Sequence, residues 1–491
     1  MPHGKMAFML AAIGSGTGKT TLTLGLLAAL RREGLSVQPF KCGPDFIDPT
    51  LHQMVSGRIS RNLDLRMCGH EYVRACFERH WADVDIAVVE GVMGLFDGGI
   101  ASPAALAKVL QIPVILLVDA KGCAESIAAV VKGFESLDPE LPLMGVIFNR
   151  VASPRHLELL SGAVRAYCQT PVLGSLPRNQ DFCIPERHLG LMMGPESPLT
   201  AAQLDLLAAA VAENIDLEAI KRLAVPSAES TPPCVGLRDR VAPPMFPSAP
   251  STEFIPAGVG RGLRELKKED RPRIGIARDQ AFCFYYQDNL DLLAAMGAEL
   301  VEFSPLLDAK LPAQLSGLYL GGGYPELYGK DLAANRTMLA EIKAWSEEGR
   351  PIYAECGGFI YLCQGVVDQV GEFWPLAGVF PCLARMGQRL ARLGYREATI
   401  TEPCLLGDSG QLFGHEFHYS EIEEMPVAVS RVYRLHDGRQ EGYQIKNTLG
   451  GYLHLHFGRT PAAAGRFVEQ CRQAENRHDL APRRRDAEGC R

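Results

Sequence analysis

The chain has 491 residues, of which 47% are hydrophobic and 22% are charged, and its formal net charge is −7. This length allows about three domains, each with its own hydrophobic core. The acidic balance and the lack of a long basic stretch exclude an electrostatic footprint for DNA or RNA, so no nucleic acid partner is expected. No apolar run is long enough to span a bilayer and no signal-peptide cleavage region follows the N-terminus, so we expect a cytoplasmic protein without membrane association. The 14 cysteines show no Cys-x-x-Cys pattern, which favours reduced thiols.

Short runs rich in Val and Ile alternate with helix-like stretches in the N-terminal half. The expected strands are residues 7–13, 86–90, 113–120 and 144–149, and the expected helices are residues 21–32, 103–110, 124–134 and 155–167. This alternation predicts the α/β class, with a parallel, doubly wound sheet that collects its ligands at the carboxyl ends of the strands.

A glycine-rich loop joins the first expected strand to the first expected helix and reads Gly14-Ser15-Gly16-Thr17-Gly18-Lys19-Thr20-Thr21. Backbone amides and a helix N-terminus bind phosphate oxygens, while a lysine adds positive charge and a threonine hydroxyl can hold Mg²⁺. Ile13 stands where the strict motif has its first glycine, yet a plain structural turn explains Gly-Lys-Thr-Thr poorly. Gly14 rather than Lys at the next position disfavours the dimerising partition ATPases.

Two acidic segments are expected at the same edge of the sheet. Glu90 ends an expected strand and begins Glu90-Gly91-Val92-Met93-Gly94-Leu95-Phe96-Asp97. The turn-rich segment 41–49 carries Lys41, Asp45 and Asp48. Loop acids are usually only solvated, but three loops that converge on one sheet edge favour metal ligation by Glu90 and Asp45.

Residues 226–271 contain recurring prolines among Ser, Ala and Gly, which predicts an interdomain linker. The strand–helix alternation then begins again. Expected strands are residues 273–277, 300–303, 317–320 and 352–354, and expected helices are residues 289–296 and 338–348, with more strand and turn after residue 373. Residues 476–491, with Arg483-Arg484-Arg485, are expected to be a disordered charged tail.

Cys356 lies between the strand Ile352-Tyr353-Ala354 and the helix that begins Gly357-Gly358. This layout is typical of a nucleophile elbow, although a lone cysteine is more often an inert core residue. Gly321-Gly322-Gly323 follow another expected strand and suit an amide-lined oxyanion hole. His454 and His456 are both candidate bases, because alternate residues of a strand share a face. A metal site at His415-Glu416-Phe417-His418 is a weaker alternative.

Several of these motifs, in this order, resemble those of the cobyrinic acid a,c-diamide synthase family (cobyrinate/hydrogenobyrinate a,c-diamide synthases, glutamine-hydrolysing). The matching segments are residues 41–49, 90–94, 320–326, 354–358 and 451–457. The resemblance implies a P-loop, dethiobiotin-synthetase-like ATP-binding and carboxylate-activating domain over residues 1–225. It also implies a class I glutamine amidotransferase domain over residues 272–475.

The resemblance further implies that the protein is an ATP-dependent carbon–nitrogen ligase of cobalamin biosynthesis. Such an enzyme uses ATP, Mg²⁺ and glutamine to amidate the a- and c-acetate carboxylates of cobyrinate through acyl phosphates. Hydrogenobyrinate or a sirohydrochlorin derivative is an alternative substrate, and a homodimer is a possible assembly. An alternative of another class is a nucleotide-switch regulatory protein with a degenerate glutaminase lobe, against which Cys356, His454 and the triple glycine argue.

The resemblance implies the following roles for the residues of the matching motifs. Nucleotide binding falls on Gly16, Thr17, Gly18, Lys19, Thr20 and Thr21; metal binding on Thr20, Asp45 and Glu90; substrate contacts on Asp48 and Asp97; catalysis on Cys356 and His454; and oxyanion or glutamine binding on Gly321, Gly322, Gly323 and Gly357. Two positions depart from the family pattern. Phe46 replaces a common Tyr, and His456 stands where many class I glutaminases have the Glu that orients the base, so the third member of the triad is undefined.

Overall fold

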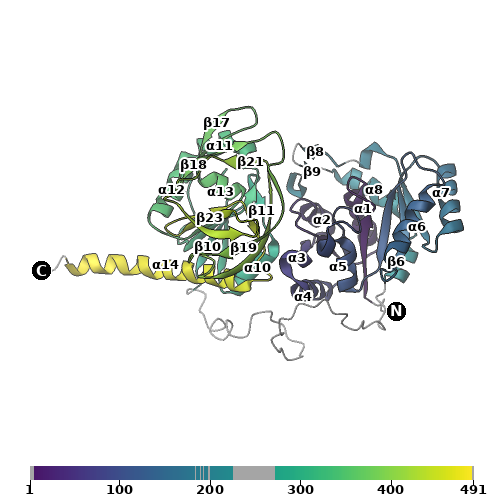
Figure 1. Ribbon diagram of the computed structural model, residues 1–491, viewed down its shortest axis with the longest axis horizontal. Coiled ribbons are helices and arrows are strands. Elements are labelled where there is room, and N and C mark those ends of the chain that lie inside the picture. The colour runs from purple at the N-terminus through teal and green to yellow at the C-terminus, as the bar shows by residue number, and fades with distance from the viewer. Residues whose placement is uncertain are drawn as a thin grey trace, which may run out of the picture. The chain divides into compact units, whose positions relative to one another are not determined.

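The computed structural model describes residues 5–182, 184–187, 190–191, 193–196, 199–224 and 271–488. These residues form two compact units. The first unit contains described residues up to 42, residues 47–60, and those from 77 to 224. The second contains residues 43–46 and 61–76 together with the described residues from 271 onward. Figure 1 shows the elements of both units in ribbon form.

The first unit is an α/β layer structure. Its strands are β1 (Met6–Ala12), β2 (Val37–Cys42), β4 (Ile86–Glu90), β5 (Val114–Asp119), β6 (Leu143–Val151), β7 (Val172–Pro177), β8 (Glu186–Arg187) and β9 (Gly190–Leu191). Its helices are α1 (Lys19–Arg32), α2 (Asp48–Ser56), α5 (Pro103–Leu110), α6 (Ile127–Leu137), α7 (Pro154–Tyr167), α8 (Ala201–Asn214) and α9 (Leu217–Leu223), and α4 (His70–Trp81) crosses the division between the units.

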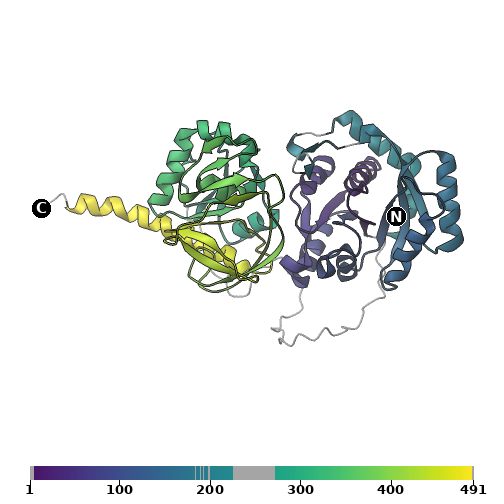
Figure 2. The same ribbon diagram turned by 45° about the horizontal axis from the view of Figure 1, so that its top comes forward.

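The strands β2-β4-β1-β5-β6-β7 lie side by side in that order and pair in parallel. Helices stand on both sides of this sheet (Figures 1 and 2), which explains why β1, β2 and β4 are buried along their whole length. β1 lies between β4 and β5 and is parallel to both, so the loops after β1 and β4 are neighbours at the carboxyl edge. The predicted doubly wound fold is therefore confirmed.

The second unit contains the remaining elements. Its strands are β3 (Arg61–Leu63), β10 (Arg273–Ala277), β11 (Phe282–Phe284), β12 (Glu299–Phe303), β13 (Gly317–Leu320), β14 (Gly322–Gly323), β15 (Ile352–Glu355), β16 (Cys363–Val367), β17 (Phe373–Pro375), β18 (Phe380–Met386), β19 (Arg392–Ile400), β20 (Gly410–His418), β21 (Ser420–Ile422), β22 (Ser430–Leu435), β23 (Gln440–Ile445), β24 (Thr448–Gly451) and β25 (His454–Leu455). Its helices are α3 (Leu65–Cys68), α10 (Gln287–Ala295), α11 (Gly329–Ala334), α12 (Arg336–Glu347), α13 (Gly357–Leu362) and α14 (Pro461–Glu488).

Ten strands of this unit form one mixed sheet in the order β12-β10-β13-β15-β24-β23-β22-β19-β20-β25. The pairs from β12 to β24 are parallel, and those from β24 onward are antiparallel where the register is defined. The antiparallel part agrees with the strand-rich composition expected after residue 373. Because β20 carries β25, residues far apart in sequence meet, and His415 is the register partner of His454.

Two segments of the N-terminal half pack with the second unit, whereas the sequence predicted one domain over residues 1–225. In segment 61–76, Asp64 caps α3 by accepting from the amides of Arg66 and Met67 at 2.8 Å and also accepts the Tyr395 hydroxyl at 2.8 Å. Arg61 Nη1 is 2.5 Å from Asp291 Oδ2. These polar contacts form only in the folded chain, and no pattern in the sequence predicts them.

The remaining boundary predictions have different outcomes. The linker expected at residues 226–271 lies outside the described residues except for Arg271. The tail expected to be disordered from residue 476 is instead helical as far as Glu488, because α14 continues through it. Ala, Arg and Glu, which are good helix formers, are frequent in this stretch and account for the difference.

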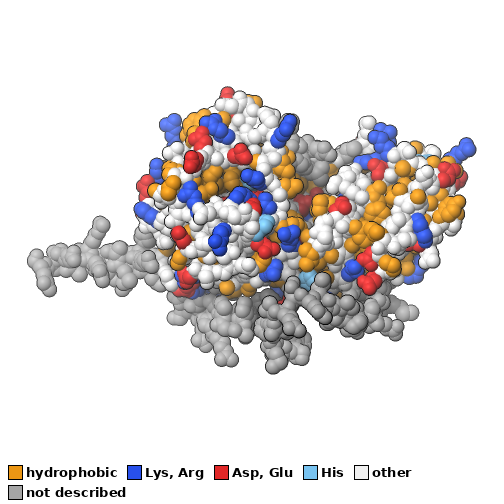
Figure 3. Space-filling model, in the orientation of Figure 1, with side chains coloured by type: hydrophobic (Ala, Val, Ile, Leu, Met, Phe, Trp, Pro, Cys, Tyr) orange, Lys and Arg blue, Asp and Glu red, His pale blue; other side chains and the backbone are white. Residues whose placement is uncertain are grey.

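Charged side chains of both signs are interspersed over the face drawn in Figure 3, with orange hydrophobic side chains between them. Within the described part of the chain, no helix has the length and apolar character needed to cross a bilayer.

Candidate active sites

The loop after β1 has the backbone of a phosphate-binding loop. Gly16 and Gly18 have φ values of 72° and 91°, and α1 begins at Lys19 directly after them. A Cβ on Gly18 would lie 2.3 Å from Asn149 Nδ2, so only glycine fits there. Asn149 in turn donates to the Thr17 carbonyl at 2.7 Å and fixes the loop against the end of β6. The free amides at the start of α1 are therefore available to an anion.

Lys19 is the cation of this loop. Its Nζ donates to the carbonyl oxygens of Gly14 at 3.0 Å and Met93 at 2.6 Å. Burial and the nearby Lys41 ammonium lower its pKa, opposed by the carboxylates around it. The loop after β4 thus holds the lysine over the phosphate-binding loop, and Thr20 and Thr21 follow it on the first turn of α1.

Glu90 is the centre of a buried cluster of polar groups at the end of β4. Its Oε1 accepts from Thr20 Oγ1 at 2.9 Å and Lys41 Nζ at 3.0 Å, and its Oε2 is 2.7 Å from His52 Nε2. Lys41 also forms an ion pair with Asp48. Burial opposes ionisation, but Lys41 and His52 hold the pKa of Glu90 well below its ordinary value. The carboxylate is therefore charged at neutral pH.

The predicted ligands Thr20 and Glu90 do come together. A hydroxyl and a carboxylate 2.9 Å apart offer the hard oxygen donors that Mg²⁺ prefers, so the residues fit this cation. The third predicted ligand, Asp45, belongs to the second unit, where its carbonyl accepts from Asn62 Nδ2 at 2.7 Å. Asp97, a predicted substrate residue, accepts the Gly94 amide at 2.9 Å and closes the loop after β4.

Two members of this site were missed by sequence reasoning. His52 is completely buried, with Nδ1 3.1 Å from Ser60 Oγ, and it neutralises the outer oxygen of Glu90. It lies one turn after Asp48 on α2, and this i, i+4 spacing was the available signal. Asn149 carried no such signal, because only the pairing of β5 with β6 brings it to the loop.

In the second unit, Cys356 occupies a sharp turn between β15 and α13. Its φ of 47° and ψ of −104° are unfavourable for a residue with a side chain. Its amide donates to the Gly451 carbonyl of β24 at 2.7 Å, which fixes the turn. A Cβ on Gly358 would lie 2.2 Å from the Leu320 carbonyl, so the helix can start this close to β13 only with glycine. This is the geometry of a nucleophile elbow.

The Cys356 thiol is almost fully buried. Burial and the carboxyl groups of Glu326, Glu355 and Glu441 raise its pKa, while a hydrogen bond from the Gly357 amide opposes the rise. The resting sulfur is therefore a thiol at neutral pH, and its reaction as a nucleophile requires a base.

His454 in β25 is suited to that role. Its ring stacks on His415 at 5.0 Å between centroids and contacts Phe46 at 5.0 Å. Burial and the neighbouring His415 lower the pKa of His454 well below its ordinary value, so the imidazole is neutral and can accept a proton. Phe46, the residue that replaces a Tyr of the family pattern, provides an apolar wall and no hydroxyl.

Strand β14, which consists of Gly322 and Gly323, lies beside His454 and beside Gly357, the residue after Cys356. A Cβ on Gly322 would lie 2.3 Å from His454 Cε1, and one on Gly357 would lie 2.9 Å from the Gly323 nitrogen. The Gly321 amide, however, already donates to the Tyr285 hydroxyl at 2.7 Å. The Gly321 amide is therefore already engaged, although the sequence predicted it as an oxyanion donor. The amides of Gly323 and Gly357 are better placed for that role.

His456, the alternative base, occupies a different environment. Its Nδ1 accepts the Gly458 amide at 3.0 Å, and its ring contacts Tyr72 and Tyr286 at centroid distances of 5.5 and 4.9 Å. Burial lowers its pKa to about 4. These contacts make His456 part of an aromatic cluster, and the proximity of Gly322 favours His454 as the base.

The weaker metal hypothesis at residues 415–418 is not supported by the arrangement. His415 Nδ1 is 3.0 Å from the Tyr286 hydroxyl, and His418 Nδ1 is 2.7 Å from the Ser420 carbonyl. Glu416 is held by Arg396 and Arg439. Each group thus has its own partner elsewhere.

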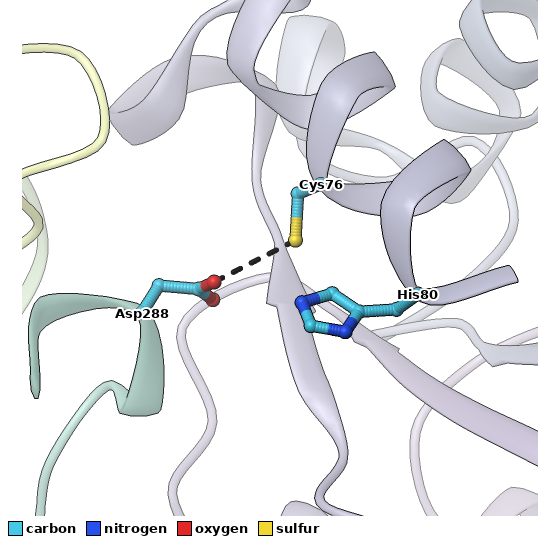
Figure 4. A group of neighbouring side chains, drawn as sticks. All are labelled: Cys76, His80 and Asp288. Carbon is cyan, nitrogen blue, oxygen red and sulfur yellow. Dashed lines mark hydrogen bonds between the residues drawn. The ribbon is translucent and has the colours of Figure 1, made fainter. Parts of the chain in front are cut away.

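Figure 4 shows another group of side chains, in which Cys76 donates to Asp288 Oδ1 at 3.7 Å within the second unit. His80, the third residue labelled there, belongs to the first unit, so we assign no ligand-binding role to the three together.

Known proteins resemble this chain over nearly its whole length. Residues 8–191 match the CobQ/CobB/MinD/ParA nucleotide binding domain, and residues 273–462 match the CobB/CobQ-like glutamine amidotransferase domain. The cobyrinate a,c-diamide synthase of Salmonella typhimurium is 43% identical over 95% of this chain and 98% of its own. Those of Synechococcus sp. and Syntrophotalea carbinolica are 41% and 43% identical over 96% and 94% of this chain and 99% and 98% of their own.

The fold and the two sites define a nucleotide-binding α/β unit joined to a glutamine amidotransferase unit that has a buried cysteine at a sharp strand–helix turn. With full-length relatives at this level of identity, the chain belongs to the cobyrinate a,c-diamide synthase family. The resemblance inferred from the motifs is thereby confirmed.

Proposed function

We propose that this protein is an ATP-dependent, glutamine-hydrolysing ligase that amidates the a- and c-acetate carboxylates of cobyrinate in cobalamin biosynthesis. The observation that carries the proposal is the presence of two sets of reactive groups in a chain that aligns over 95% and 96% of its length with two named cobyrinate a,c-diamide synthases. One set suits phosphoryl transfer, and the other suits amide hydrolysis.

Carboxylate activation is the task proposed for the first unit. A carboxylate is a poor electrophile, so its oxygen must first become a leaving group, and transfer of the ATP γ-phosphoryl group forms an acyl phosphate. Lys19 and the amides of the glycine loop would neutralise the charge on the transferred group. Thr20 and Glu90, with Asp45, would hold Mg²⁺, and the ion would supply positive charge that stabilises the phosphates. Asp48 and Asp97 remain the proposed substrate contacts.

Ammonia supply is the task proposed for the second unit. Cys356 would attack the glutamine amide carbon as His454 takes the thiol proton, and His454 would return that proton to the departing ammonia. Water then releases glutamate from the thioester. The Gly323 and Gly357 amides would stabilise the oxyanion formed on the carbonyl oxygen. Ammonia produced here stays unprotonated long enough to attack the acyl phosphate only if it avoids bulk water.

Product analysis tests the proposal. Purified protein would be incubated with glutamine, ATP, Mg²⁺ and, separately, cobyrinate, hydrogenobyrinate and a sirohydrochlorin derivative. Mass spectrometry should find two successive amidations on cobyrinate, with glutamate released in proportion. A heavy-oxygen label in the substrate carboxylates should appear in inorganic phosphate, as an acyl phosphate requires. Amidation of another tetrapyrrole would change the substrate, and no amidation of any of them would favour the regulatory alternative.

The setting of the activity is also a proposal. We place the enzyme in the cytoplasm, acting without nucleic acid and as a homodimer. Size-exclusion chromatography with light scattering measures the assembly directly.

A further inference from the structure

The imidazole of His454 lacks an evident orienting partner in the sequence. A buried general base works best when its second nitrogen is held by an acceptor, because this fixes the tautomer and stabilises the imidazolium that forms during reaction. His456, two residues later, cannot supply a negative charge, and its Nδ1 is already bonded to the Gly458 amide.

The structure leaves one nitrogen of His454 in a distinctive position. Its Nδ1 is buried and has no hydrogen-bond partner among the residues that the structure describes. The nearest carboxylate oxygen is Glu355 Oε2, 3.9 Å away, and both side chains are 2% exposed. This distance is an ion-pair contact and lies about 1 Å beyond a hydrogen bond. A small rotation of the imidazole would therefore bring Nδ1 within hydrogen-bond distance of Glu355 Oε2.

Glu355 is itself firmly held at this place. Oε1 accepts the Leu455 amide at 3.0 Å and also the Tyr353 hydroxyl, and Oε2 accepts the Tyr319 hydroxyl at 3.1 Å. Leu455 follows His454 in β25, so the same carboxyl group that faces the ring also fixes its backbone. Glu355 is also the last residue of β15, directly before Cys356.

We propose that Glu355 is the positioning residue of the glutaminase triad, holding the Nδ1–H of His454 so that Nε2 receives the Cys356 proton. The S–H bond breaks as Nε2–H and the sulfur–carbon bond form, and the carboxylate stabilises the resulting imidazolium. The inference rests on the proposed glutaminase activity and assigns the member of the triad that the sequence left undefined.

Electrostatics agree with this role. Burial raises the pKa of Glu355 to about 7, while the hydroxyls of Tyr353 and Tyr319 and the Leu455 amide favour the carboxylate. Above about pH 7 the carboxyl group is therefore ionised and can stabilise an imidazolium at His454. Other titratable groups near the pair are His415, which stacks on His454, His418 and Cys356.

Glu355→Gln tests the proposal because it keeps the size of the side chain and removes the charge. We expect the glutaminase kcat to fall by about 100-fold or more, as when a triad carboxylate is amidated, with the KM for glutamine unchanged. Amidation driven by ammonium should stay at the wild-type rate, which shows that the variant is folded. Glu355→Asp, which keeps the charge, should retain more glutaminase activity than Glu355→Gln.

Two further measurements separate positioning from a structural role. In the wild type, kcat should fall as the pH drops through about 7, where Glu355 gains a proton, and Glu355→Gln should lack this limb. The rate at which iodoacetamide alkylates Cys356, followed by mass spectrometry, should fall in the same variant. The matched control His456→Asn should keep the wild-type pH profile and alkylation rate.

Particular outcomes would overturn the inference. These are a kcat of Glu355→Gln within twofold of the wild type, an equal loss with glutamine and ammonium, or a larger loss in His456→Asn. Failure of the proposed substrate is distinct, since it would appear in the wild type as glutamate release without amidated cobyrinate. If the wild type released no glutamate, Cys356 alkylation would still decide whether Glu355 acts on His454.

Discussion

At the scale of single residues, the chemistry of the protein depends on a few buried groups whose ionisation is set by close neighbours. Glu90 is charged although it is buried, because Lys41 and His52 compensate it. The thiol of Cys356 is protonated because burial and three carboxyl groups outweigh the Gly357 amide. Each site thus combines charges that would be costly to bury alone.

Cys356→Ala should abolish amidation with glutamine as donor and leave amidation with high ammonium intact. The substitution removes only the source of ammonia, while the carboxylate is still activated in the first unit. The measurement is the amidated product formed with each donor. An equal loss with both donors would contradict the division of labour between the two units.

Lys19→Ala should abolish amidation with either donor, because the carboxylate is then never activated. Loss of one charge contact to a transferred phosphoryl group typically costs about 3 kcal/mol of transition-state stabilisation, or roughly 100-fold in rate. Product formation with ammonium is the direct assay. Ammonium-dependent turnover at the wild-type rate would show that ATP binds elsewhere.

At the scale of elements, two tight turns position the reactive groups. The loop between β1 and α1 requires glycine at residue 18, and the elbow between β15 and α13 requires it at residue 358, because neighbouring atoms leave no room for a Cβ. In the short strand β14, Gly322 likewise has no room for a Cβ, because the His454 ring is its neighbour. These positions define where the backbone of each active site can approach its ligand.

Gly322→Ala should reduce glutaminase activity by about tenfold or more while sparing the ammonium-dependent reaction. The new Cβ would lie 2.3 Å from His454 Cε1, so the imidazole must move away from its productive position. Glutamate release measures the effect. The control is Gly465→Ala on α14, where the Cβ would meet only Met296 Sδ at 3.7 Å, and it should behave as the wild type. Unchanged glutamate release by Gly322→Ala would contradict the placement of His454.

At the scale of the whole molecule, the second unit contains carboxyl groups that folding keeps protonated. Burial and the charge of Glu416 raise the pKa of Glu441 to about 8, and within the described part of the chain Glu441 Oε2 has no hydrogen-bond partner. The folded state therefore binds more protons than the unfolded state between the ordinary glutamate pKa and about 8. Stability conferred by this group is present at low pH and is lost as the pH rises through that window.

Glu441→Gln should consequently weaken the decline of stability with pH. A single such group contributes about 1.4 kcal/mol per pH unit between its two pKa values, and the amide removes that contribution. Denaturant unfolding at several pH values between about 5 and 8 measures the slope. The variant should gain stability relative to the wild type toward the upper end, and parallel curves would show that Glu441 is ionised in the folded protein.

Much of the α/β framework could be predicted because its signal is local. The strands β1, β4, β5 and β10 are short, mainly apolar runs, and the structure places them where the pattern predicted. The brief strands β11 and β14 have too few residues for any periodicity, and they form only because each pairs with the other. Segment 61–76 joins the second unit through ion pairs and caps that a linear reading does not reveal.

The sequence by itself determined the two chemistries of this protein, because the glycine loop and the strand–Cys–Gly–Gly turn are local motifs whose backbone requirements are encoded in adjacent residues. Tertiary structure alone decided which distant side chains complete them. His52 reaches Glu90, and Glu355 faces His454, only because α2 is folded against its sheet and β25 is the register partner of β20. Such contacts depend on packing between elements far apart in the chain, which a local motif does not specify.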